Sequence, residues 1–151
     1  MTEFKIQVAS TDHLRGQRRQ GNKVYSSIAP FKGLFVTHIY QGRNENEGFF
    51  LKMMGVYPGV SDLLVIWATP TGVDFGFIEM KTDKGRLSPP QIKFKGICQA
   101  FGIKWALCRT VRQVHDTVKG WGAECVHDTV IEPDLRTKEE KYEALHKAMW
   151  T

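Results

Sequence analysis

The sequence predicts an α/β protein in which a central mixed sheet is flanked by helices. Two observations lead to this prediction. Apolar runs of strand length, 62–68 and 103–108, are interleaved with segments whose apolar residues recur at helical spacing. In addition, "TPTG" separates 62–68 from the strand-like stretch 73–81, which is typical of a β-hairpin and therefore of an antiparallel pair. Strands alternating with helices indicate helices packed in layers on a sheet.

Length and composition indicate one globular domain, 1–151. A chain of this size buries about two-thirds of the surface that it exposes when unfolded. Hydrophobic residues make up 42% and charged residues 25%, with no run apolar enough to cross a membrane and no apolar signal core in residues 1–10. Three cysteines without CxxC spacing favour buried thiols in a reducing compartment over a disulfide framework or a zinc site. We therefore expect an intracellular, cytoplasmic protein.

The N-terminal third is the least regular in pattern. Glycines interrupt its polar, helix-like stretches, and its arginines predict a basic N-terminal arm over 1–33. Residues 34–40 are rich in β-branched and aromatic side chains and predict a strand. The segment 44–55 predicts a short helix, and its aromatic and methionine side chains are expected in the core. These side chains are Phe50, Met53 and Met54.

The remaining elements have clear start and stop signals. Ser88 followed by proline predicts a helix start, and Gly102 predicts its end. A second helix begins after Thr110, with an apolar stripe at helical spacing. A capping box opens the last helix, which lies within a C-terminal helical extension over 123–151. Its two members are Thr137 and Glu140.

Charge is unevenly distributed around a net value of +5. Residues 82–122 carry 8 basic against 2 acidic side chains, whereas residues 59–81 carry 1 against 3. Residues 1–58 are again basic, with 8 against 4. Basic flanks suit a polyanion and an acidic segment between them suits a cation. Solvated surface charge produces the same pattern, and charge alone does not decide between the two.

The predicted hairpin brings two acids and a lysine together. A turn centred near Thr71 places Asp62 opposite the segment from Glu79 to Lys81. Adjacent carboxylates repel unless a cation lies between them, and Mg²⁺ takes carboxylate, water and phosphate oxygens. A neighbouring lysine could orient or deprotonate a water, or neutralise charge on a phosphate. These groups predict metal-assisted phosphodiester hydrolysis. The alternative is an exposed Glu79–Lys81 ion pair, because E-x-K triplets are common by chance.

Several short motifs together resemble the VRR-Nuc domain of the PD-(D/E)xK nuclease superfamily. They are "GVSD", "FIEMK", "GRLSPPQ" and "AFGIKWALCRT", within a matched core of about 34–122. Small stand-alone members of this family are frequent in phages and prophages. The resemblance implies a restriction-endonuclease-like fold, with a central mixed sheet flanked by helices. It also implies a homodimeric, metal-dependent endonuclease that cuts branched or otherwise structured DNA, as Holliday-junction resolvases do.

The resemblance implies a role for each motif residue. Asp62 and Glu79 would ligate Mg²⁺ or Mn²⁺, helped by the backbone carbonyl of Met80. Lys81 would be the base or water-orienting group, and Gln91 would lie near the site.

One departure from the family pattern concerns a glutamate on its first helix. No acidic residue lies between Asp12 and Glu45, and Gln17 or Gln20 stands about where the acid is expected. Either Glu3 or Asp12 serves instead, or the site holds its metal with fewer charges. The departure keeps a second hypothesis open, a non-catalytic nucleic-acid-binding protein that retains the nuclease fold.

Basic residues near these motifs are candidates for phosphate contacts, with exposed arm, loop or turn positions as the alternative. His38 is expected to be a packed or edge histidine rather than a ligand. The candidates for DNA binding are Arg15, Arg18, Arg43, Lys84 and Arg86.

Overall fold

The computed structural model describes residues 2–42 and 44–150. Its centre is a four-stranded sheet in the order β4–β5–β6–β7. Strands β4, β5 and β6 are antiparallel, and β7 pairs with β6 in parallel, so the sheet is mixed as predicted. The strands are Leu34–His38 (β4), Leu63–Thr69 (β5), Gly72–Met80 (β6) and Lys104–Cys108 (β7).

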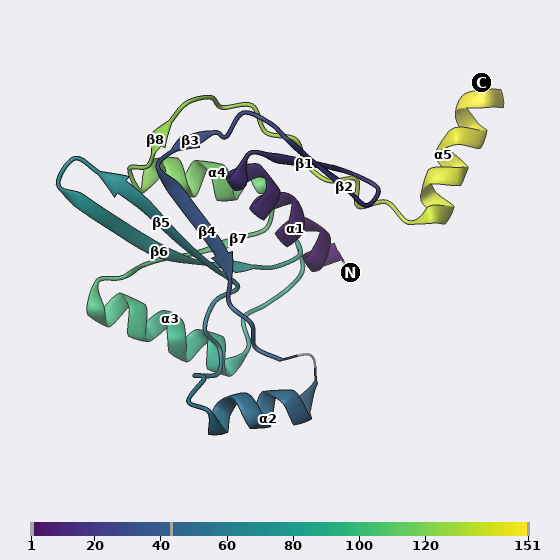
Figure 1. The fold of residues 1–151 in the computed structure, drawn as a ribbon. Coiled ribbons are helices and arrows are strands. Elements are labelled where there is room, and N and C mark those ends of the chain that lie inside the picture. The colour runs from purple at the N-terminus through teal and green to yellow at the C-terminus, as the bar shows by residue number, and fades with distance from the viewer. Residues whose placement is uncertain (1, 43, 151) are drawn as a thin grey trace.

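Helices cover both faces of this sheet (Figure 1). On one face lie α1, Thr2–Arg15, and α4, Val111–Gly120. On the other lies α3, Pro89–Phe101, whose Phe94 packs edge-on against Phe77 of β6. The result is a three-layer α/β arrangement with its sheet in the middle, which confirms the predicted fold class.

The main hydrophobic core lies between the sheet and the α1–α4 layer. Trp67 of β5 stacks on Trp121, which follows α4, with ring centroids 5.7 Å apart. Gly76 makes room for that indole, because a Cβ at this position would lie 2.6 Å from the Trp121 ring. The core residues around this pair include Ile6, Leu14, Val36, Val65, Ile78, Met80, Val114 and Val118.

The N-terminal region differs from the expected basic arm over 1–33. Residues of α1 enter the core, because Ile6 and Leu14 are buried against the sheet. The antiparallel hairpin after α1 is mostly exposed, and it consists of β1, Gln17–Gln20, and β2, Lys23–Ser26. A further two-residue strand, β3 at Phe31–Lys32, pairs with β8 at Glu124–Cys125.

The central hairpin and the two helices that follow it match the predictions closely. Leu63 pairs with Ile78, a register one step from the one inferred from the turn. Helix α3 starts at Pro89 and ends at Gly102, which adopts the left-handed conformation that favours glycine. Thr110 caps α4 by accepting a hydrogen bond from the Gln113 N–H.

Helices α2, Glu45–Met53, and α5, Lys138–Trp150, correct two expectations. The side chains assigned to the core from the first of these helices are exposed: Phe50, Met53 and Met54. The C-terminal extension is helical only in α5, which projects away from the domain (Figure 1). Within the described residues, no helix combines the length and apolarity needed to span a membrane.

Candidate active site

The hairpin ends with two carboxylates side by side. Asp62 directly precedes β5, and Glu79 is the penultimate residue of β6. The last pair of the ladder, Leu63 with Ile78, places these two residues opposite each other at the next step. The Met80 N–H donates to Asp62 Oδ2 at 2.8 Å, which fixes the Asp62 side chain across the strand end.

Glu79 is the buried centre of this site. It is 1% exposed, although it carries a carboxyl group. Gln91 Nε2 donates to Glu79 Oε1 at 2.8 Å, and Lys81 Nζ lies 3.8 Å from the same oxygen. The alternative of an ion pair at an exposed strand end is therefore wrong, because the pair lies under α3 and is largely shielded from solvent.

Gln91 is held by both ends of its amide. Its Oε1 accepts a hydrogen bond from the Ser88 N–H at 2.8 Å, while its Nε2 faces Glu79. The first contact satisfies an unpaired N–H at the start of α3, and the second reaches the carboxylate. The start of α3 therefore orients the amide toward the site.

The surroundings of Glu79 disfavour the charged form of its carboxyl group. Burial and the neighbouring Asp62 carboxylate raise the pKa of Glu79 to about 8. Lys81 opposes this shift, whereas Glu3, in the first turn of α1, adds to it through its charge. Two carboxylates therefore meet at the strand end, with a third acid near enough to act on Glu79 through its charge, and carboxylate oxygens suit a hard divalent cation.

Glu3 and Asp12, the two candidates for the first-helix acid, lie in different surroundings. Of the two candidates, Glu3 is close enough to Glu79 for its charge to act on that carboxyl. Asp12 lies nine residues further along the same helix, about 14 Å away. Its carboxylate pairs with Arg19 at 2.7 Å. Gln17 and Gln20 lie at the two ends of strand β1 and add no carboxylate.

The loop before Asp62 is fixed by neighbouring elements. Trp105 Nε1 donates to the buried Ser61 Oγ at 2.9 Å. The Asp62 carbonyl accepts the Ile39 N–H at 2.9 Å and lies 2.8 Å from His38 Nδ1, so His38 is an edge histidine, as expected. At Gly59 the chain passes so close to α3 that a Cβ would lie 2.4 Å from the Pro90 carbonyl carbon.

Arg109, which the sequence analysis did not single out, braces the loop that leaves the site. Its Nη1 donates to the carbonyls of Thr82 and Gly85, the latter at 2.8 Å. Lys84 and Arg86 on this loop are exposed. Arg109 belongs to the motif "ALCRT", which by itself does not indicate this contact. The parallel pairing of β6 with β7 sets Cys108 beside Met80, and this brings Arg109 next to the loop that follows β6.

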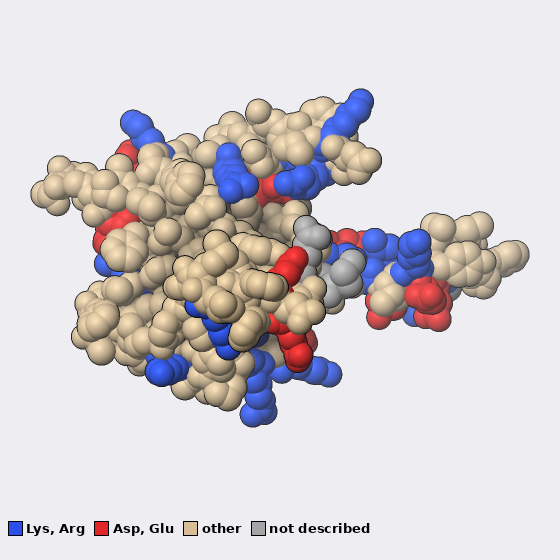
Figure 2. All heavy atoms as spheres, turned by 60° about the horizontal axis from the view of Figure 1, so that its bottom comes forward, with Lys and Arg blue, Asp and Glu red and all other residues tan. Residues whose placement is uncertain are grey.

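The other basic candidates lie apart from one another. Arg15 is exposed, and its guanidinium donates to the Val36 carbonyl, while Arg18 is exposed on β1. Arg43 lies outside the described residues. On the face shown in Figure 2, Lys and Arg side chains form separate groups rather than one continuous patch.

A mixed sheet that ends in clustered carboxylates with a lysine beside them has the arrangement of a nuclease-type domain. The family model of the VRR-NUC domain matches residues 3–112, so the chain belongs to the VRR-NUC family. VRR-NUC domains are nuclease-type domains, and a nuclease domain implies DNA as its substrate. The match begins at Glu3 and ends at Arg112, whereas the sequence motifs indicated a core over 34–122.

A comparison with solved structures supports the same fold. The chain is similar to a structure described as a VRR_NUC domain protein, with a TM-score of 0.56 and 16% sequence identity. The alignment covers 87% of this chain and 97% of the other. No curated protein matches the sequence.

Proposed function

We propose that this protein is a metal-dependent endonuclease that hydrolyses phosphodiester bonds in branched or otherwise structured DNA. The observation that carries this proposal is the buried Glu79, which lies between a second acid and a lysine. A buried carboxylate that faces another is costly to a fold. The cost is explained if a cation and a phosphate occupy the site during function.

The proposed cofactor is Mg²⁺, or Mn²⁺, held by Asp62 and Glu79. Supporting ligands are Glu3, directly or through water, and the Met80 carbonyl. The raised pKa of Glu79 supports this fit, because a divalent cation would stabilise the carboxylate form that burial and Asp62 disfavour. Such an ion would lower the pKa of a bound water and stabilise negative charge on the phosphate.

Lys81 and Gln91 are proposed to position the reacting groups. Lys81 Nζ lies beside Glu79 and can orient the attacking water, or neutralise charge that develops on the phosphate. In the hydrolysis, the water oxygen forms a bond to phosphorus and a phosphorus–oxygen ester bond breaks. Gln91 keeps the Glu79 carboxylate in place and is a positioning residue.

DNA would reach the site along its exposed basic rim. Lys84 and Arg86 lie on the loop directly after Lys81, and Arg109 holds that loop through a hydrogen bond to the Gly85 carbonyl. Arg18 projects from the β1–β2 hairpin. Separate basic groups, rather than one straight stripe, favour a substrate with several duplex arms. The second candidate, a DNA-binding protein without catalysis, has no need of a buried glutamate beside a second acid and a lysine.

We also propose a homodimer, in which α5 packs against a second copy of the chain. Three apolar side chains at helical spacing on α5 are exposed: Tyr142, Leu145 and Met149. A 13-residue helix is marginal alone in water, so its apolar face calls for a partner. A two-fold pair is the commonest closed assembly. Light scattering at several concentrations tests this, and a monomer throughout would contradict it.

The activity is tested with cleavage of labelled junction, flap and linear DNAs in Mg²⁺, in Ca²⁺ and in EDTA. We expect cleavage in Mg²⁺ alone, with junction or flap DNA cut faster than linear duplex. Binding to all three DNAs without cleavage under any condition would favour the non-catalytic candidate. Equal cleavage of all three would retain the nuclease and overturn the preference for structured DNA.

A further inference from the structure

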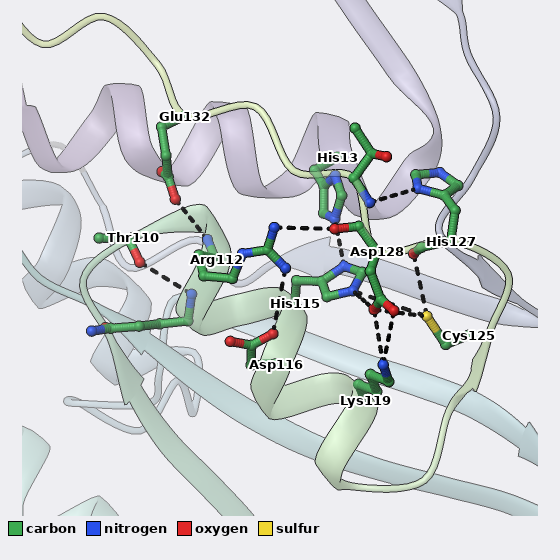
Figure 3. A network of polar contacts seen from close by, with 12 residues as sticks. His13, Thr110, Arg112, His115, Asp116, Lys119, Cys125, His127, Asp128 and Glu132 are labelled. Atoms are coloured by element: carbon green, nitrogen blue, oxygen red, sulfur yellow. Dashed lines mark hydrogen bonds and ion pairs between the residues drawn. The ribbon is translucent and has the colours of Figure 1, made fainter.

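A second polar cluster lies beside the C-terminal part of α1, where His13 contacts His115 (Figure 3). It combines His115 of α4, Cys125 of β8 and Asp128 of the segment that follows. His115 Nε2 lies 2.9 Å from Asp128 Oδ1, and Cys125 Sγ lies 3.3 Å from the same oxygen. Cys125 Sγ and His115 Nε2 are 4.0 Å apart. Three different ligand types therefore point at one another.

These separations agree with the coordination of a single small ion. In a tetrahedral zinc site, nitrogen and oxygen ligands at about 2.0–2.2 Å and sulfur at about 2.3 Å lie roughly 3.3–3.7 Å from one another. The three observed separations bracket this range, so sub-ångström movements of Cys125 toward His115 and of the exposed Asp128 away from it would complete the geometry. One nitrogen, one sulfur and one oxygen form a borderline-soft set, which selects Zn²⁺ over Mg²⁺.

The surroundings orient the ligands. His13 Nε2 lies 2.9 Å from His115 Nδ1, so a hydrogen bond between the two rings can leave the His115 Nε2 lone pair facing the other ligands. Lys119 Nζ contacts both oxygens of Asp128, at 3.0 and 2.9 Å. Its ammonium keeps the Asp128 carboxylate turned toward the cluster and offsets part of the charge of the thiolate and carboxylate.

The cluster is not arranged as a cysteine nucleophile with its base. Asp128 Oδ1 lies between the sulfur and the imidazole, closer to each of them than they are to each other. Cys125 also donates to the His127 carbonyl at 3.2 Å. A carboxylate beside the sulfur opposes formation of a free thiolate. A metal ion, in contrast, uses all three groups at once.

The location suggests what such an ion would do. Residues 113–151 lie beyond the part of the chain that the family model matches. In this region Glu132 accepts the Val111 and Arg112 N–H groups at the start of α4, and Val126 N–H donates to the Pro30 carbonyl. An ion that joins His115 to Cys125 and Asp128 would tie this returning segment to α4.

We propose that His115, Cys125 and Asp128 form a structural Zn²⁺ site that fastens residues 124–132 to the helical layer. The fourth position faces solvent on the side of Asp128 and holds a water. These ligands show no CxxC spacing, because they come from separate segments of the chain.

Cobalt substitution tests the site without interference from the carboxylates at Glu79. A thiolate bound to Co²⁺ gives a near-ultraviolet charge-transfer band, and the Asp62–Glu79 site offers no sulfur. We expect the band to saturate at one equivalent of Co²⁺ in the full-length protein, and equimolar Zn²⁺ to abolish it. Zinc should also raise the unfolding temperature of the metal-free protein. Absence of the band, or failure of zinc to remove it, would overturn the proposal.

Variants assign the band to its ligands. Cys125→Ser should abolish it, whereas Cys98→Ala, which removes a buried thiol on α3, should leave it unchanged. His13→Ala, one step removed from the ion, should weaken cobalt affinity about 10- to 100-fold. His115 is fully buried, so its variants are at risk of misfolding. The exposed ligand Asp128 is changed instead, and Asp128→Asn should bind Co²⁺ more weakly than the parent does. A band retained in Cys125→Ser would assign the signal elsewhere and refute the site.

Discussion

The two polar clusters of this domain lie toward opposite ends of one helix and differ in how their charges are balanced. Glu3 at the start of α1 acts on Glu79, and His13 near its end contacts His115. Ten residues of helix separate them by about 15 Å. The candidate metal ligands of the first cluster are all oxygens, whereas those of the second are nitrogen, sulfur and oxygen.

One carboxyl in each cluster shows the difference most clearly. The pKa of Glu79 is raised to about 8 by burial and by Asp62. The pKa of Asp128 is instead held below its usual range by hydrogen bonds from His115 and Lys119. The donors around Asp128 favour its carboxylate form, whereas burial and Asp62 disfavour that of Glu79 in spite of the neighbouring Lys81. An unsatisfied charge retained in a fold is expected where chemistry takes place.

Removal of the ionisable carboxyl group of Glu79 should have the largest effect on activity. Glu79→Gln keeps the shape of the side chain and can keep its contact with Gln91. It removes the charge proposed to hold the metal, so cleavage in Mg²⁺ should fall by at least about 100-fold. DNA affinity in Ca²⁺ should stay equal or increase, because repulsion between carboxylate and phosphate is lost.

The matched control is Asp74→Asn on the same strand. Asp74 is a partly exposed acid at the far end of β6, paired with Lys104 at 2.7 Å. This variant should cut DNA at the parental rate. Lys81→Met should slow cleavage with DNA affinity unchanged. If Glu79→Gln cut as fast as the parent, the nuclease site would not be at this strand end.

The raised pKa of Glu79 also predicts how stability depends on pH. Because its carboxyl binds a proton more tightly in the folded state, its stabilising contribution is complete below the ordinary pKa of 4.5. That contribution is lost as pH rises toward 8. In the metal-free protein, the free energy of unfolding should therefore fall over this range, by a few kcal/mol at most.

Urea unfolding at several pH values measures this slope. His13 contributes the opposite sign, because burial lowers its pKa to about 4 and its protonation destabilises the fold as pH falls below 6.5. The difference between the parent and Glu79→Gln isolates the carboxyl. Added Ca²⁺ should flatten the parent's curve and leave the variant's unchanged. Parallel curves for parent and variant would show that Glu79 is not the group responsible.

A third prediction concerns the loop that carries Asp62. Gly59 and Gly55 both have positive φ angles, +84° and +98°, so alanine strains either position by about 1–2 kcal/mol. Only at Gly59 would the new Cβ also collide with the Pro90 backbone. We expect Gly59→Ala to lose about 1–3 kcal/mol more stability than Gly55→Ala, and to reduce cleavage by displacing Asp62 from α3. Equal losses in denaturant unfolding would exclude the role of this close approach.

The sequence was most informative where local chemistry determines structure. The turn at Thr71 set the register that brings Asp62 to Glu79, and Ser88 and Gly102 set the bounds of α3. In α2, the spacing of apolar residues led to a wrong prediction of burial. A periodic pattern shows which side chains share a helix face, but not whether another element covers that face. Phe50 and Met53 share such a face and are exposed.

Long-range contacts explain the features that the sequence did not reveal. On β6, Phe75 and Phe77 alternate as the residues of a core face do, yet Phe75 is exposed. The more deeply buried residues are Ile78 and Met80, of the opposite parity, because α1 and α4 cover that face. The approach of Glu3 to Glu79 likewise depends on how α1 crosses the sheet. No signal within residues 1–20 specifies that crossing.

The smallest predicted effect concerns the basic rim of the active site and its salt dependence. If Arg86 contacts a phosphate, DNA affinity of the parent should fall linearly on a plot of log affinity against log salt, and Arg86→Ala should reduce the slope by about 1. The same change at Lys141 of α5, an exposed cation far from the site, serves as the control and should leave the slope unchanged. Binding is measured in Ca²⁺ by fluorescence anisotropy, so that cleavage does not intervene. Because the loop is held by Arg109 and not by Arg86, the variant should keep the parent's unfolding midpoint. An identical slope for Arg86→Ala and the parent would show that Arg86 does not contact DNA. The site at Asp62 and Glu79 would then have to receive its substrate from the side of the β1–β2 hairpin.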